Sequence, residues 1–200
     1  SGRRIHRQEN SLLHPKFLPV PVSMKKILLL PILLICSCQQ TEEKTPVDYV
    51  DPLIGSSNSR WMLFPGPTMP LGMVKLSPDN QDEVWMGGYE YTIKSVNGFS
   101  HIHEWTMGGL LMLPVNGDIK TKTGRVSDPF KGANSGYHSR TLNEKAEVGY
   151  YSTELYDYGI KAELTATERC GMQRYTFPED DTSRVLIDLQ FPTEWNYGFT

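Results

Sequence analysis

Three kinds of side chain in the stretch 64–109 could take part in chemistry on a ligand. Trp85 opens the glycine-rich run WMGGY, His101 and His103 lie two positions apart, and Glu104 follows them. An indole ring packs against the C–H-rich face of a sugar while its N–H still needs a polar partner. The residues alone thus allow Trp85 to be a sugar platform, although they favour half-buried packing in the framework.

The His-x-His pair has several possible uses. On a strand, residues two apart place both rings on the same face, as metal ligands or as hydrogen-bond partners. A zinc site needs further ligands, and no third His, Cys or acid stands at a clear ligand spacing. We expect His101 and His103 to act as neutral donor–acceptors that shape a sugar cleft, or to be satisfied structural histidines. Glu104 could accept hydrogen bonds from sugar hydroxyls, but we do not expect it to be a catalytic acid.

The segment 64–69, FPGPTM, is built to be rigid. Its two prolines fix φ, and Gly66 lets the backbone approach another group closely. That group is either a ligand, which makes Phe64 and Gly66 candidates for substrate binding, or part of a rigid interdomain turn.

Short runs with period-2 character predict strands rather than helices to carry these loops. Ile160–Ala166 shows the pattern most clearly, with aliphatic residues on one face. Asp157-Tyr158-Gly159, just before it, is typical of a tight hairpin turn. Cys170 alternates with Met172 and is expected to be a small core residue. The other expected strands are 71–76, 89–93, 110–115, 150–156, 172–177 and 185–189.

Strands separated by turn signals, without a long helix, predict an all-β fold, an antiparallel β-sandwich over residues 47–200. The polar stretch 120–143 lacks the alternating pattern of the other segments. We expect it to be a long excursion from one edge of the sandwich.

Four ordered blocks of this chain resemble the N-terminal domain of glycoside hydrolase family 92. They are DPLIG at 51–55, FPGPTMPLGMV at 64–74, Trp85 with GYEY at 88–91, and GFSHIH at 98–103. The resemblance implies a calcium-dependent, exo-acting and inverting α-mannosidase in which Trp85 lines the mannose pocket.

The same resemblance places the catalytic acid, the base and most calcium-binding carboxylates in a C-terminal (α/α)-barrel domain, which is not part of this sequence. No catalytic residue is therefore expected here, and the chain alone should be inactive. It would supply one wall of the cleft for α-mannoside glycans. The alternatives are a non-catalytic surface lipoprotein that binds glycans and a purely structural envelope domain.

The first residues indicate targeting rather than structure. Residues 1–23 have no periodicity, whereas 24–37 begin with Met-Lys-Lys and continue into an apolar run, as a signal peptide does. The junction Ile35-Cys36-Ser37-Cys38 resembles a bacterial lipobox, so Cys38 is the expected lipidation site. Cleavage by ordinary signal peptidase is the alternative. Residues 38–46 would then tether an outer-membrane lipoprotein, periplasmic or surface-exposed.

Charge argues against one class of partner. Loss of residues 1–37 would remove six basic residues and one acidic residue, so the formal net charge would fall from −3 to −8. A chain this acidic, with no basic stripe, has little with which to neutralise phosphates. We therefore expect no nucleic-acid partner.

Overall fold

The computed structural model describes residues 43–57, 63–80, 88–103, 108–128, 132–179 and 182–189. The chain divides into two compact units, 1–43 and 44–200, and all the described helices and strands belong to the second. Trp85, Glu104 and Cys38 lie outside the described residues, as do the upstream segment 1–23 and the expected signal peptide 24–37.

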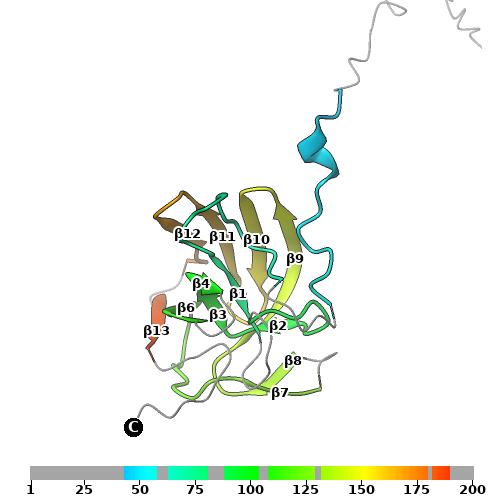
Figure 1. The fold of residues 1–200 in the computed structure, drawn as a ribbon. Helices are drawn as coiled ribbons and strands as arrows, with labels where there is room; N and C mark the ends of the chain where they lie inside the picture. Colours follow the sequence, from blue (N-terminus) through cyan, green and yellow to red (C-terminus); the bar gives the residue numbers. More distant parts are fainter. Residues whose placement is uncertain are drawn as a thin grey trace, which may run out of the picture. The chain divides into compact units, whose positions relative to one another are not determined.

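Two antiparallel sheets form the body of the second unit (Figure 1). The first has four strands, in the order β1-β3-β6-β13. The second has five, in the order β12-β11-β10-β9-β2. The strands of the first sheet are β1 (Ser77–Asp79), β3 (Gly98–Ser100), β6 (Leu111–Val115) and β13 (Arg184–Asp188). Those of the second are β2 (Ser95–Val96), β9 (Ser139–Glu147), β10 (Tyr150–Leu155), β11 (Ile160–Ala166) and β12 (Gly171–Thr176).

The five-stranded sheet contains the strand in which the alternation of apolar and polar residues is clearest. In β11 the aliphatic residues Ile160, Ala162 and Leu164 are buried, as the period-2 pattern predicts. The turn before β11 places Gly159 at a φ of +64°, a conformation that glycine adopts without steric cost. β10 and β11 thus form the hairpin expected from the sequence, with Leu155 opposite Ile160.

Both sheets contribute to one hydrophobic core. The Phe99 ring of β3 lies 6.2 Å from that of Tyr175 in β12, and Tyr175 makes an edge contact with Phe177. The fully buried members are Leu76, Val96, Phe99, Leu111, Leu113, Val115, Tyr137, Tyr151, Leu155, Ile160, Ala162 and Leu164. A sandwich of two antiparallel sheets around a shared core confirms the expected fold class.

Smaller elements complete the unit. A 3₁₀ helix, η1, covers Pro46–Tyr49. Two short hairpins pair β4 (Ile102–His103) with β5 (Gly108–Gly109), and β7 (Arg125–Asp128) with β8 (Gly132–Ser135). In the described part of the chain, no helix is both long and apolar enough to cross a membrane.

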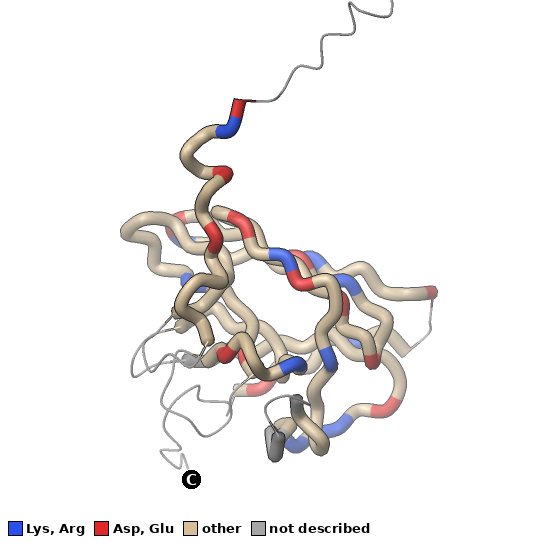
Figure 2. The backbone as a smooth tube through the Cα atoms, turned by 90° about the vertical axis from the view of Figure 1, so that its right-hand side faces the viewer, with Lys and Arg blue, Asp and Glu red and all other residues tan. Residues whose placement is uncertain are grey.

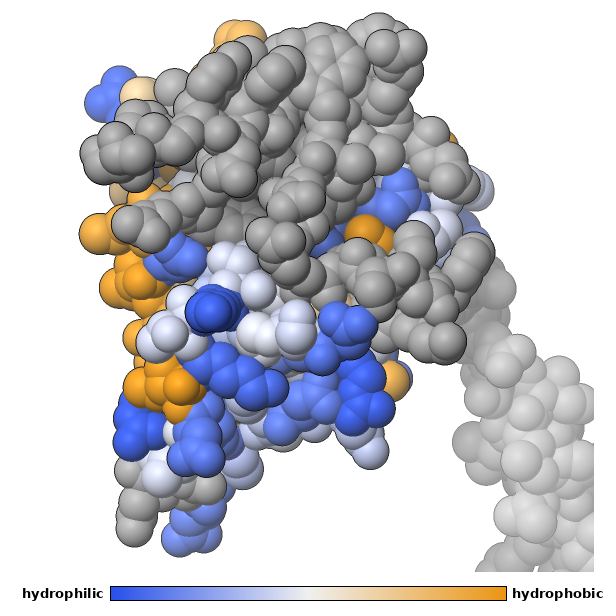
Figure 3. Space-filling model, turned by 90° about the horizontal axis from the view of Figure 1, so that it is seen from below, coloured by the Kyte–Doolittle hydropathy of each residue, from blue (hydrophilic) through white to orange (hydrophobic). Residues whose placement is uncertain are grey.

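The edge strand β13 leaves an apolar face uncovered. Val185, Ile187 and Leu189 alternate along it and are exposed. Leu186 points the other way and packs against the core. Figure 3 shows apolar side chains gathered on the side of the molecule where β13 lies.

Four expectations about the elements were wrong. The strand predicted at 71–76 is irregular apart from an isolated bridge between Lys75 and Thr68, with Leu71 and Met73 exposed, and β1 begins only at Ser77. The strand predicted at 89–93 is a turn as well. Part of the expected excursion, residues 139–143, belongs to β9. Cys170 is exposed, because it lies in a turn where its N–H donates to the Thr167 hydroxyl.

Candidate functional site

The four motif blocks meet through backbone hydrogen bonds. Tyr91 N–H donates to the Ser56 carbonyl at 3.0 Å, which joins the third block to the end of the first. Lys75 N–H donates to the His101 carbonyl at 3.0 Å, so the second and fourth blocks lie side by side. The blocks are therefore joined in two pairs, and Asn80, which follows β1, connects them through its hydrogen bond to Gly88. We call the described residues 51–56, 64–80 and 88–103 the loop cluster; it includes β1 and β3.

Asn80 connects the two residues that flank the segment containing Trp85. Its N–H donates to the Gly88 carbonyl at 2.8 Å. The buried Asn80 amide also donates to the Glu90 carbonyl at 2.9 Å and accepts from the Glu90 N–H at 2.8 Å. These side-chain hydrogen bonds replace the backbone hydrogen bonds that a neighbouring strand would make, and they hold residues 88–93 as a turn. Asn80 was not among the residues predicted from the sequence.

His103 is fully buried, and both of its ring nitrogens face acceptors. Nδ1 lies 2.8 Å from the Lys75 carbonyl oxygen, and Nε2 lies 3.3 Å from an Asp79 carboxylate oxygen. Burial opposes the charged ring, but the attraction of the Asp79 carboxylate and the hydrogen bonds to backbone carbonyls outweigh it, so the pKa of His103 is raised. Both ring nitrogens thus face groups of the protein itself, which agrees with the structural-histidine alternative.

The aromatic residue of the FPGP turn rests on this histidine. The Phe64 ring centroid lies 5.2 Å from that of His103, with the two planes tilted by 38°. Two residues on, Gly66 approaches the protein's own strand, since a Cβ there would lie 1.9 Å from the Leu76 carbonyl oxygen. The close approach expected at Gly66 thus serves packing against β1, which agrees with the rigid-turn alternative.

His101 occupies a different environment. It is half-buried, and a Cβ on Gly171 would come within 2.6 Å of its ring, so β12 begins directly against it. Gln173 Nε2 lies 3.5 Å from its Nδ1. Burial lowers the pKa of His101, with a smaller contribution from His103. Of the pair, His101 is therefore the one suited to neutral hydrogen bonding.

Two buried side chains beside this pair have acceptors with no hydrogen-bond donor within the described residues. Neither Asp79 oxygen accepts a hydrogen bond of good geometry, and the Asn97 amide oxygen has none. The ion pair with His103 is the compensation available to Asp79. Sequence reasoning missed Asp79, although an acid at the end of a short strand before a Trp-bearing loop is a usable signal.

Two other carboxylates, both on the five-stranded sheet, have structural roles. Glu144 accepts from the hydroxyls of Tyr89 at 2.6 Å and Tyr151 at 2.7 Å. The Arg174 guanidinium holds Glu163 at 2.8 Å and, with help from the Tyr150 hydroxyl, lowers the pKa of Glu163 to about 2. Figure 2 shows acidic and basic residues next to one another along these strands.

The described residues do not fit a calcium site. No three His, Cys, Asp or Glu side chains among them gather where they could hold a metal ion. Calcium takes about six to eight oxygen ligands, which this loop cluster does not assemble. What the cluster does is bring together the residues that flank the segment containing Trp85.

The described residues thus form an all-β domain of two antiparallel sheets with the motif blocks joined by backbone hydrogen bonds. Residues 49–198 match the glycosyl hydrolase family 92 N-terminal domain, and the chain belongs to this family. The expected family is thereby confirmed.

Solved structures agree with this assignment. A family GH92 α-mannosidase from Bacteroides thetaiotaomicron, in complex with mannoimidazole, is 34% identical with a TM-score of 0.66, over 74% of this chain and 20% of that one. A family GH92 inverting mannosidase from Bacteroides thetaiotaomicron VPI-5482 is 26% identical with a TM-score of 0.54, over 73% of this chain and 20% of that one.

A curated relative comes from Arthroderma benhamiae and is named an uncharacterized secreted glycosidase. It is 30% identical over 150 residues, which is 70% of this chain and 19% of the relative. The chain thus spans about a fifth of the length of the relatives it matches.

Proposed function

We propose that this chain is the N-terminal part of an exo-acting, inverting, calcium-dependent α-mannosidase that removes terminal mannose from mannan or N-glycans. The observation that carries the proposal is the loop cluster of the four motif blocks, where Asn80 connects the residues that flank the segment containing Trp85. The domain supplies one wall of the cleft. Trp85 stacks on the sugar, and Glu104 accepts hydrogen bonds from its hydroxyls.

The reaction needs groups that this wall does not provide. An inverting glycosidase places a general acid and a general base about 6.5–9.5 Å apart, with room for a water molecule between them. Asp79, Glu144 and Glu163 are held by protein partners instead. The acid, the base and the calcium ligands therefore come from the remainder of the enzyme. The exposed apolar face of β13 is a surface on which further protein can pack.

The mature protein is a lipoprotein anchored through Cys38 to the bacterial outer membrane. The support for this part is the lipobox-like junction after an apolar run. Several acyl chains would hold it there, because each buried CH₂ contributes about 0.8 kcal/mol.

The test compares residues 38–200 with the complete protein on aryl-α-mannosides and α-1,2-mannobiose, with calcium and then with chelator. We expect calcium-dependent release of mannose from the complete protein and none from residues 38–200. Proton NMR of the first product should show inverted stereochemistry. Hydrolysis by residues 38–200 alone would place the catalytic carboxylates within this chain. A complete protein that binds mannan without cleaving it would favour the glycan-binding lipoprotein.

A further inference from the structure

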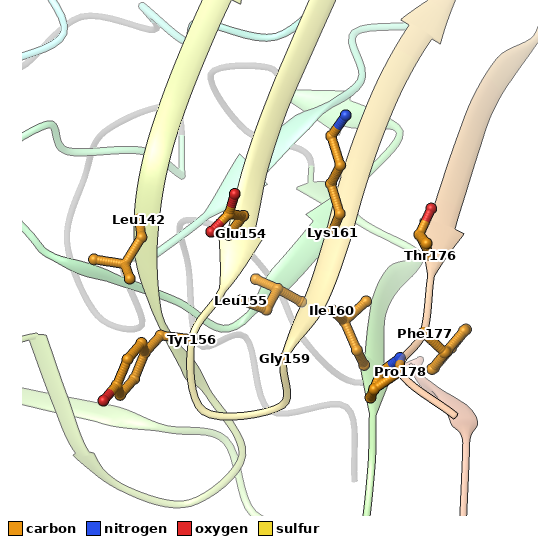
Figure 4. Close-up of a pocket in the computed structure, with 10 residues that line it drawn as sticks. All are labelled: Leu142, Glu154, Leu155, Tyr156, Gly159, Ile160, Lys161, Thr176, Phe177 and Pro178. Atoms are coloured by element: carbon orange, nitrogen blue, oxygen red, sulfur yellow. The ribbon is translucent and has the colours of Figure 1, made fainter. Parts of the chain in front are cut away.

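A hollow lies on the five-stranded sheet, where the β10–β11 hairpin turns (Figure 4). Its volume is about 310 Å³, near the lower end of the range for small-molecule sites. Leu142, Glu154, Lys161 and Thr176 line it and are consecutive cross-strand partners on β9, β10, β11 and β12. Because partners in an antiparallel sheet project from the same face, these four side chains form one row.

This row lies away from the loop cluster. His101 contacts β12 at Gly171, the first residue of that strand, whereas Thr176 is the last. A strand rises about 3.3 Å per residue, so the two ends lie roughly 17 Å apart. Gln173, which approaches His101, is opposite the buried Leu164 and so points to the other face of the sheet.

The aromatic residue at the rim of the hollow is held in a fixed orientation. Tyr156 is 55% exposed, and the Arg140 guanidinium lies 4.3 Å from its ring centroid. Asp157 holds that guanidinium through Nε at 3.0 Å and Nη2 at 2.6 Å. Tyr156 N–H also donates to the Arg140 carbonyl at 2.9 Å. A ring fixed in this way loses little entropy when a ligand packs on it.

The two charged residues of the row, Glu154 and Lys161, can still form hydrogen bonds to a ligand. Lys161 lies opposite Glu154, yet its ammonium donates to Glu163 at 3.2 Å. Within the described residues Glu154 makes no hydrogen bond or ion pair. One carboxylate with open acceptor sites thus stands beside an ammonium with further N–H donors. Their charges cancel, which favours a neutral ligand rich in hydroxyls over an anion or a cation.

We propose that this hollow is a second saccharide-binding site. The Tyr156 ring packs against the C–H face of a sugar, Phe177 provides a further apolar contact, and Glu154 and Lys161 hydrogen-bond its hydroxyls. Such a site holds a long glycan on the domain while its end is processed elsewhere. The choice of mannan as the probe rests on the proposed function, whereas the site itself does not.

The experiment uses the complete protein and the variants Tyr156→Ala and Glu154→Gln, with Tyr49→Ala as a matched control because Tyr49 is 72% exposed and does not line the hollow. Retardation by yeast mannan in a native gel gives the apparent affinity. Hydrogen exchange with and without mannan locates the contact. Hydrolysis of a small aryl-α-mannoside tests the proposed function independently.

We expect mannan to slow exchange of the hairpin amides 156–159 in the parent protein. Tyr156→Ala and Glu154→Gln should each weaken retardation about three- to tenfold, with unchanged aryl-mannoside kinetics and melting temperature. Tyr49→Ala should match the parent. Unchanged retardation in both hairpin variants, or no protection of 156–159, would overturn the second site even in an active mannosidase. Protection of the hairpin in a protein that cleaves no mannoside would leave it standing and reject the proposed activity.

Discussion

Nε2 of His103 lies 3.3 Å from the Asp79 carboxylate, and both side chains are completely buried. The other ring nitrogen faces the Lys75 carbonyl, so an imidazolium, which carries an N–H on each nitrogen, suits both neighbours. This ion pair links β1 to β4 beneath Phe64. It is the structural centre of the loop cluster.

The pair predicts how stability depends on pH. Because the folded pKa of His103 lies above its unfolded value of about 6.5, the imidazolium stabilises the fold fully below that value. The contribution is lost as the pH rises through the folded pKa. We expect hydrogen exchange of residues 75–80 and 98–103, corrected for its intrinsic pH dependence, to become faster above about pH 6.5. Asp79→Asn should flatten this dependence, whereas His138→Asn should not. A parent protein whose local stability rises with pH would contradict the assignment.

Gly66→Ala should destabilise the FPGP turn. The new Cβ would meet the Leu76 carbonyl at 1.9 Å, and relief requires the turn to move away from β1. Overpacking of this kind costs about 1–3 kcal/mol, or more where backbone must shift. Faster hydrogen exchange in residues 64–80 is the measurement. Gly117→Asn is the control, since a Cβ there meets nothing within 4 Å and Asn tolerates its φ of +74°. Equal effects of the two changes would contradict the role given to Gly66.

Asn80→Ala should loosen the turn at residues 88–93, which follows the segment containing Trp85. It removes the partner of both the N–H and the carbonyl of Glu90, and an unsatisfied buried group costs about 1–3 kcal/mol. Amides 88–93 should exchange faster, and kcat/KM for mannosides should fall if that segment binds sugar. Asn143→Gly provides an exposed Asn for comparison, at a φ of +51° that glycine accepts. Unaltered exchange in 88–93 would show that the turn is held by other contacts.

Trp85→Ala should weaken mannoside turnover by the complete enzyme. Loss of a desolvated stacking surface corresponds to about 1–3 kcal/mol in kcat/KM. Steady-state kinetics on an aryl-α-mannoside and on α-1,2-mannobiose, together with the melting temperature, are the measurements. Unchanged kinetics with an unchanged melting temperature would leave Trp85 as a framework residue.

Cys38→Ala should abolish lipidation and release the protein from the membrane fraction. The reason is that the lipobox-like junction offers Cys38 as the acceptor of the acyl chains. Labelling with radioactive palmitate, together with fractionation, tests this. The control is Cys170→Ala, which changes an exposed cysteine far along the chain and should remain labelled and membrane-bound. Continued labelling of Cys38→Ala would mean that the anchor lies elsewhere.

The sequence by itself determined the family and the fold class. Four ordered motif blocks identify the family, and local alternation identifies strands where the sheet pattern is regular. Ile160–Ala166 is a strand as predicted, and Gly159 takes the positive φ that its turn requires. These features depend on neighbours along the chain, so periodicity detects them.

Only the tertiary structure decided the features that depend on contacts between residues far apart in the sequence. Residues 89–93 contain strand-forming side chains, but the Asn80 side chain hydrogen-bonds to the backbone of Glu90, and the segment forms a turn. Leu71 is apolar and yet fully exposed, since Gly72 N–H donates to the Met69 carbonyl and makes a turn at Leu71 instead of a strand. The charge state of His103 depends on Asp79 and on a carbonyl of Lys75, which the register of β1 and the start of β4 bring together. No periodicity encodes a meeting of residues 24 positions apart along the chain (79 and 103), because it is the fold that brings them to 3.3 Å.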